Sequence, residues 1–172
     1  MKTGSLLRLF PLCTLLLAAA SIAGAQTTPS SEANYPAWTA ISHKLEANPL
    51  DPQLNRDAEV AVQEVSTSPD FHTPLCSSFF NFFSKLSTTG YPYQAQIYRL
   101  YLLGSATYRI ETGRTDPYGT NTYAFTSVLK GYSVIIAKDP NARVKTMDDL
   151  LLTDLKGKLP DMLKKDSTCR ER

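Results

Sequence analysis

The sequence lacks the local motifs by which many enzyme classes are recognised. It contains no HExxH or Cys/His zinc pattern, no GxSxG elbow, no Walker loop, no GxGxxG turn and no CxxC pair. Its two histidines, His43 and His72, are far apart and have no partner at metal-ligand spacing. These absences disfavour a metal, nucleotide or thiol-redox enzyme, and we expect neither a metal nor a cofactor.

Beyond its N-terminus the chain has no hydrophobic run long enough to span a bilayer. Residues 1–25 have the layout of a secretory signal peptide, with a positively charged start, an apolar core over 12–22 and small residues at 23–25. The core is shorter than the roughly 20 residues that a spanning helix needs. We expect cleavage after Ala25 and export to a bacterial periplasm or the exterior, with no membrane span left. A retained anchor is the alternative.

An excess of charge of one sign is also missing once the leader is removed. Cleavage takes Lys2 and Arg8 from the 18 basic residues and so balances them against the 16 acidic ones. A balanced chain gives no electrostatic reason to expect nucleic acid or an anionic membrane as partner. We therefore expect no nucleic-acid partner, and export favours an envelope protein as the partner class.

Cysteine is scarce. Cys13 lies in the leader, which leaves Cys76 and Cys169 in the mature chain. Two thiols in an exported protein are most simply interpreted as one disulfide. The chain-entropy model assigns about 4 to 5 kcal/mol to a bond that closes so long a loop. Two unpaired thiols are the alternative.

No segment alternates strictly between polar and apolar residues, as a half-buried strand would. Apolar residues recur at three- and four-residue steps, which is the helical period. We expect an all-α fold, a single-domain bundle of about six or seven helices in antiparallel hairpins. The predicted helices cover 35–47, 52–65, 75–86, 93–111, 120–138 and 146–155, with a short helix from Pro160.

The same patterning divides the chain into four parts. We expect a signal peptide over 1–25, a disordered polar linker over 26–34 and a frayed C-terminus over 170–172. The remaining residues, 35–169, form the single helical domain. A domain of this size can bury a sizeable core.

Residues 93–111 are the longest well-patterned segment of the mature chain. They are apolar around most of the helix circumference, which favours burial between other helices. Gly104 lies in the middle of this segment, and Gly131 lies in the middle of the next predicted helix. A glycine inside a helix costs roughly 1 kcal/mol relative to alanine. We therefore expect the two helices to approach each other closely at these residues.

Leu103, Gly104, Tyr132 and the Asp-Pro-Asn turn at 139–141 resemble a degenerate tetratricopeptide-type helix pair. The resemblance covers about residues 98–141. The distance from Gly104 to the turn is about a dozen residues longer than one such repeat allows, and no second copy follows at the repeat period. The resemblance implies helix-hairpin packing and does not extend to membership of the family.

Residues 75–86 hold four of the seven phenylalanines. Phe79, Phe82 and Phe83 share one helical face, and Phe80 points elsewhere. We expect this stretch to fill the core beneath the central helix. A hydrophobic ligand pocket or a contact with a membrane surface is the alternative.

Arg99 and Arg109 lie on the central helix, which is otherwise apolar. They are separated by roughly 15 Å along the helix axis. A buried arginine needs a carboxylate partner or an anionic ligand. We therefore treat both residues as possible ligand contacts, with a structural ion pair or a surface position as the alternative.

The scarcity of reactive side chains in the patterned segments favours a non-catalytic binding or interaction module of the bacterial envelope. The alternative is an enzyme with a dispersed active site that involves Arg99, Arg109 or His72. A deep pocket that joins one of these arginines to His72 or to a carboxylate would favour the enzyme. A solid core with an apolar surface groove would favour binding.

Overall fold

The computed structural model describes residues 34–170, so the expected signal peptide, most of the linker and residues 171–172 lie outside the described residues. The predicted all-α fold is confirmed, and residues 34–170 contain no strand. Within this range no helix is both long and apolar enough to cross a membrane. The elements are α1 (Tyr35–Ala47), α2 (Pro52–Thr67), α3 (Ser77–Thr88), α4 (Gln94–Thr112), α5 (Pro117–Lys138), α6 (Lys145–Leu155) and α7 (Leu159–Lys165), with 3-10 turns η2 (Pro140–Ala142) and η3 (Ser167–Cys169).

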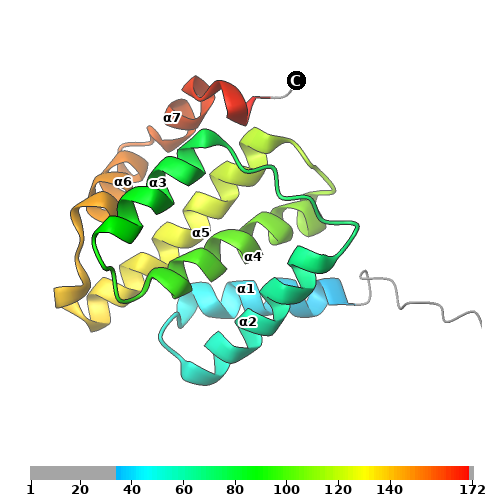
Figure 1. Cartoon of the computed structure of the whole chain (residues 1–172), viewed down its shortest axis with the longest axis horizontal. Coiled ribbons are helices and arrows are strands. Elements are labelled where there is room, and N and C mark those ends of the chain that lie inside the picture. The colour runs from blue at the N-terminus through cyan, green and yellow to red at the C-terminus, as the bar shows by residue number, and fades with distance from the viewer. Residues whose placement is uncertain (1–33, 171–172) are drawn as a thin grey trace, which may run out of the picture.

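The antiparallel pair α4 and α5 forms the centre of the bundle (Figure 1). α1 and α2 pack along one side of this pair, and α3, α6 and α7 lie toward the other side. Every residue of α4 from 101 to 108 is buried, as expected for a helix that is apolar over most of its circumference. The tight turn between the two helices includes Gly113, which ends α4 in a left-handed conformation with φ 67°.

The two mid-helix glycines lie at close contacts between α4 and α5, as the sequence predicts. A Cβ added to Gly104 would lie 2.8 Å from the Cβ of Ser127 and 3.2 Å from the Cα of Ala124. A Cβ added to Gly131 would overlap the side chain of Leu100. The glycines do not face each other, because each one admits a residue of the opposite helix. Each missing side chain therefore permits part of the close packing.

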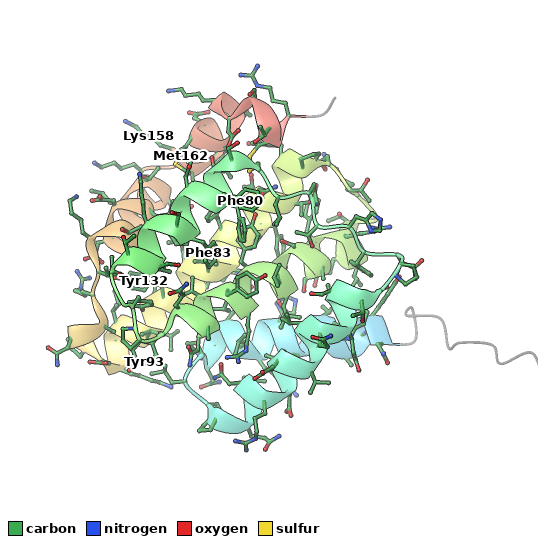
Figure 2. The ribbon with its side chains drawn as sticks, viewed as in Figure 1. Phe80, Phe83, Tyr93, Tyr132, Lys158 and Met162 are labelled. Atoms are coloured by element: carbon green, nitrogen blue, oxygen red, sulfur yellow. A yellow bond between two sulfur atoms is a disulfide. The ribbon has the colours of Figure 1, made fainter. Side chains whose placement is uncertain are left out.

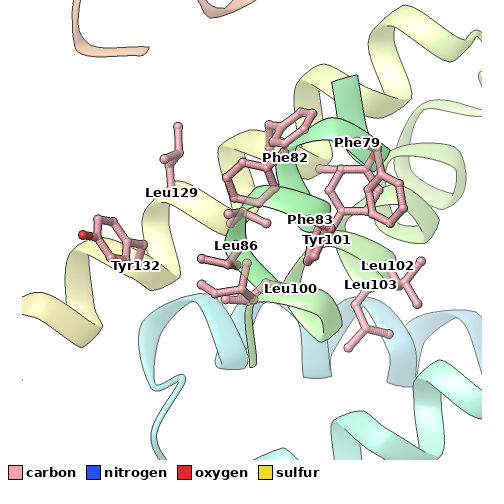
Figure 3. Close-up of a cluster of buried hydrophobic side chains, with 14 of the residues drawn as sticks. Phe79, Phe82, Phe83, Leu86, Leu100, Tyr101, Leu102, Leu103, Leu129 and Tyr132 are labelled. Carbon is pink, nitrogen blue, oxygen red and sulfur yellow. The ribbon is translucent and has the colours of Figure 1, made fainter. Parts of the chain in front are cut away.

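Aromatic and leucine side chains from α3, α4 and α5 meet in one buried cluster (Figure 3). The ring centroids of Phe79 and Tyr101 lie 4.5 Å apart, and Phe82 meets Phe125 edge-on at 5.5 Å. Such ring pairs contribute about 0.5–1.5 kcal/mol beyond the burial of their area. The expectation that the phenylalanine stretch fills the core is thus confirmed for Phe79 and Phe82, whereas Phe80 is 57% exposed.

Two of the helices begin at an Asp-Pro pair. Asp51 caps α2 and Asp116 caps α5, and each carboxylate accepts a hydrogen bond from the backbone N–H three residues further on, at 2.8 Å and 2.6 Å. The proline that follows has no N–H to satisfy and is preset for the first helical turn. The prediction of a loop through Gly119 and a helix start at Thr120 is therefore wrong, because the cap at Asp116 starts α5 earlier.

The C-terminal segment is attached to the start of α3. Cys76 and Cys169, the two thiols predicted to pair, are bonded, with their Cα atoms 5.0 Å apart, and both side chains are buried. Beside the bond, the backbone N–H of Ser77 donates a hydrogen bond to Thr168 Oγ1 at 2.7 Å. These contacts hold α7 and η3 against the N-terminal end of α3.

The two glycines differ in what an added methyl group would meet, and this difference gives a matched test. Gly104→Ala places the methyl against the Ser127 Cβ and the α5 backbone, which cannot move away. Gly131→Ala places it against the end of the Leu100 side chain, which can change rotamer. Overpacking of a core costs about 1–3 kcal/mol, against roughly 1 kcal/mol gained in helix propensity. We expect Gly104→Ala to lower the free energy of unfolding in urea by about 1–2 kcal/mol, and Gly131→Ala to lower it by less. A Gly104→Ala variant that is as stable as the wild type, or more stable, would contradict close packing at this point.

Candidate functional site

A surface groove of about 300 Å³ lies between α3 and α6, with α7 at one end. Its floor consists of four apolar side chains: Phe82, Phe125, Leu150 and Met162. Its rim consists of polar ones: Ser78, Asn81, Lys85, Thr146, Asp149 and Thr153. Figure 2 shows Met162 at the end of the groove that lies near the start of α3. An apolar floor with a polar rim is the usual composition of a small-molecule site.

Helical spacing explains why these residues share one groove. On α3, Ser78 and Phe82 are four residues apart, as are Asn81 and Lys85, so both pairs lie along one side of the helix. On α6 the lining residues recur at steps of three and four from residue 146 to residue 153. Each helix therefore presents one stripe of mixed apolar and polar side chains to the groove.

The rim of the groove carries one positive charge that no neighbour neutralises. The ammonium group of Lys85 has no hydrogen bond or ion pair among the described residues and is exposed. The carboxylate of Asp149 is paired with Lys145, whose Nζ lies 2.7 Å and 2.9 Å from its two oxygens. Asp149 therefore contributes little net negative charge, and Lys85 sets the sign of the charge at this end of the groove.

The wall of the groove at the start of α3 is fixed by Asp166. Its Oδ2 accepts hydrogen bonds from the backbone N–H and the hydroxyl of Ser78, at 2.6 Å and 2.7 Å. Its Oδ1 accepts from the backbone N–H and the hydroxyl of Thr168, at 3.0 Å and 2.7 Å. Burial alone would raise the pKa of Asp166, but the hydrogen bonds from Thr168 and Ser78 outweigh burial and lower that pKa to about 2.

Arg99 has a structural partner. Its guanidinium lies 2.8 Å from the carboxylate of Glu59 and donates a longer hydrogen bond to Asn55, so it ties α4 to α2. The side chain of Glu59 is 70% exposed, and an exposed ion pair of this kind contributes at most about 1 kcal/mol. Arg99 therefore has the carboxylate partner that its interpretation as a structural ion pair requires.

Arg109 and His72 do line a common cavity, together with Ser105 and Thr120, but the cavity is very small. Its volume is about 10 Å³, which is room for a single water molecule and excludes a substrate. The guanidinium of Arg109 lies over the ring of Phe71, 5.0 Å from its centroid, and this contact occupies one of its faces. Arg109 and His72 thus share a cavity, but this cavity is not a deep pocket.

The structure also shows a buried carboxylate that no sequence pattern indicates. Glu46 on α1 is only 7% exposed. It accepts a hydrogen bond from the hydroxyl of Ser127 at 2.7 Å and one from the ammonium of Lys130 at 2.9 Å, both on α5. Both of its oxygens are thus engaged, and Ser127 is fully buried, so this hydroxyl is closed to a substrate. The cluster attaches α1 to α5.

His43 extends this cluster to the surface. Its Nε2 lies 2.8 Å from Glu111 at the end of α4, and its Nδ1 lies 3.8 Å from Glu46. Tyr123 donates a hydrogen bond to the other oxygen of Glu111 at 3.1 Å, and burial together with this carboxylate raises the pKa of Tyr123. The side chains come from α1, α4 and α5, and α1 is distant in sequence from the other two, so no local pattern reveals the cluster.

One potential metal-ligand group occurs within residues 34–170. Cys76, Cys169 and Asp166 bring one ligand atom each within 4.8 Å of one another. The two sulfurs are joined to each other, and both oxygens of Asp166 already accept two hydrogen bonds. These three residues therefore serve to anchor the C-terminal segment.

Comparisons with protein-family models, with curated proteins and with solved structures find no match to this chain. The groove and the polar clusters described above are therefore the features from which a function has to be inferred.

The low pKa of Asp166 predicts how stability changes in acid. The folded state favours the charged carboxylate, so its contribution is fully present above the usual pKa of 3.8 and is lost as the pH falls through about 2. We expect Asp166→Asn to destabilise the protein by about 1 kcal/mol at pH 6, because the amide nitrogen that replaces one carboxylate oxygen cannot accept its two hydrogen bonds and the remaining two lose the assistance of the charge. The difference from the wild type should shrink between about pH 4 and pH 2 in thermal melts.

Asp154→Asn is the matched control, because the Asp154 side chain makes no hydrogen bond or ion pair among the described residues. It should leave the acid profile of the wild type unchanged. A stability difference between Asp166→Asn and the wild type that stays constant from pH 6 to pH 2 would show that the charge of Asp166 does not matter.

Proposed function

We propose that the mature protein is a non-catalytic, exported module of the bacterial envelope that binds a small, largely apolar ligand in the groove between α3 and α6. The observation that carries the proposal is the floor of the groove, where Phe82, Leu150 and Met162 border an opening of about 300 Å³. That volume is at the lower end of the range for small-molecule sites. Phe82 and Leu150 are only 8% and 7% exposed, so a ligand would cover the edges that they present to the groove, at about 25 cal/mol for each Å² of apolar surface removed from water.

The other polar residues support binding rather than catalysis. Arg99 is held by Glu59, and the cavity shared by Arg109 and His72 admits no more than a water molecule. The carboxylate of Glu46 is held by its hydrogen-bond donors on α5. A catalytic acid, base or nucleophile has to reach a bound substrate. Among the described residues, Lys85 at the rim of the groove is a charged group without such a partner.

Export is supported by the signal-peptide layout of residues 1–25 and by the buried bond between Cys76 and Cys169. Disulfides of this kind persist in oxidising compartments such as the periplasm. The intact mass of the protein secreted by an expressing bacterium, taken without reductant, tests both points. We expect a chain that begins at Gln26 and lacks two hydrogens. A mass that includes the leader or two free thiols would contradict export and pairing.

A neutral, fluorescent apolar probe, N-phenylnaphthylamine, tests the groove directly. We expect saturable binding to the oxidised protein, with an increase in fluorescence as the probe leaves water. Thr153→Trp places an indole in the mouth of the groove and should weaken binding at least about tenfold, which corresponds to about 1.4 kcal/mol. The control is Val60→Trp, which adds the same side chain to the exposed face of α2, where Val60 is 59% exposed.

Thermal melts establish that both tryptophan variants are folded. If the probe binds to the wild type without saturation, or if Thr153→Trp and Val60→Trp bind it equally well, then the groove is not the site.

A further inference from the structure

We propose that the groove selects a small amphiphile with a single anionic head, a carboxylate, and binds it with the head at Lys85 and the apolar tail directed toward Met162. This inference rests on the proposed function, because it assigns a ligand class to the same groove. It follows from the distribution of charge and of hydrogen-bond donors along the rim.

The head position is set by α3. Asn81 and Lys85 are adjacent on one side of this helix, and both line the groove. Neither the amide of Asn81 nor the ammonium of Lys85 has a hydrogen-bond or ion-pair partner among the described residues. Two neighbouring donors without acceptors suit a carboxylate, which has two oxygens and accepts only. A charge-assisted hydrogen bond from Lys85 would be the stronger of the two contacts.

The opposite wall does not favour a cationic head. Asp149 is the carboxylate that lines the groove, and Lys145 already holds it at 2.7 Å. A cationic ligand would have to share Asp149 with Lys145 and would also meet the free ammonium of Lys85. Counted together, these three side chains leave one positive charge at this end of the groove, where the end of α3 lies beside the start of α6 (Figure 1).

The orientation of the tail follows from the other end of the groove. Ser78 uses its hydroxyl to bond Asp166, whose carboxylate is charged and would repel an anionic head. Met162 lies at this end and offers a flexible, apolar contact. From Ser78 to Lys85 the helix rises by about 10 Å, which is comparable to the length of an extended octyl chain.

Three ligands that share an octyl chain test the charge selection. Octanoate, octanol and octylamine are titrated into the oxidised protein by calorimetry at neutral pH, and each is also tested for displacement of N-phenylnaphthylamine. We expect octanoate to bind about three- to fivefold more tightly than octanol, which is the range for an ion pair at a partly exposed site. Octylamine should bind more weakly than octanol.

Two lysine variants locate the selectivity. In Lys85→Gln, octanoate and octanol should bind with equal affinity. In Lys85→Glu, octylamine should bind most tightly of the three ligands. Lys44→Gln makes the same charge change on the exposed surface of α1, away from the groove, and should leave the wild-type order intact. These substitutions are at exposed positions, so loss of folding does not confuse the result.

The outcomes separate this inference from the proposed function. If octanoate and octanol bind equally to the wild type while both displace the probe, the charge selection is wrong and the groove remains a binding site. The inference is also wrong if the wild type binds octylamine more tightly than octanoate. It is equally wrong if Lys85→Gln still binds octanoate more tightly than octanol. If none of the three ligands nor the probe binds, both proposals fail.

Discussion

The close packing of α4 against α5 is the contact on which the rest of the fold depends. Gly104 leaves room for Ser127 and Ala124 of α5, and Gly131 leaves room for Leu100 of α4. The middle of α4, residues 101–108, is buried on all sides, and the remaining helices pack around the pair rather than between its members. The same register brings Ser127 beneath the buried carboxylate of Glu46, which joins α1 to the centre.

Around this centre the polar groups divide into those that hold the bundle together and those left free. Arg99, Glu46 and Asp166 each connect helices that are distant in sequence, and each is engaged by its partners. The apolar face of α3 serves two purposes, because Phe82 contacts the aromatic cluster and also forms part of the groove floor. The rim donors on α3 face solvent without partners. This contrast is the physical reason for placing ligand binding at α3 and α6.

Much of the fold follows from the sequence because its signals are local. Apolar periodicity identified the seven helical segments, and the energetic cost of Gly104 indicated close approach of a neighbour. The predicted start of α5 at Thr120 is wrong, although Asp116-Pro117 repeats the cap pattern of Asp51-Pro52 at α2. The groove was not predictable, because Phe82, Leu150 and Met162 are brought together only by packing. For the same reason the sequence identified Arg99 and Arg109 as unusual without showing the ion pair with Glu59 or the very small cavity at Arg109.

Hydrogen exchange followed by mass spectrometry, on the oxidised protein with and without saturating N-phenylnaphthylamine, tests the central claim that the groove between α3 and α6 is the binding site. Ligand binding at a groove slows the local openings of its walls. Binding in the groove predicts slower exchange in peptides from α3, α6 and α7, and unchanged exchange in α1 and α2. Slower exchange confined to residues 71–74 and to the end of α4, beside Arg109, would place the probe elsewhere and exclude the groove as its site.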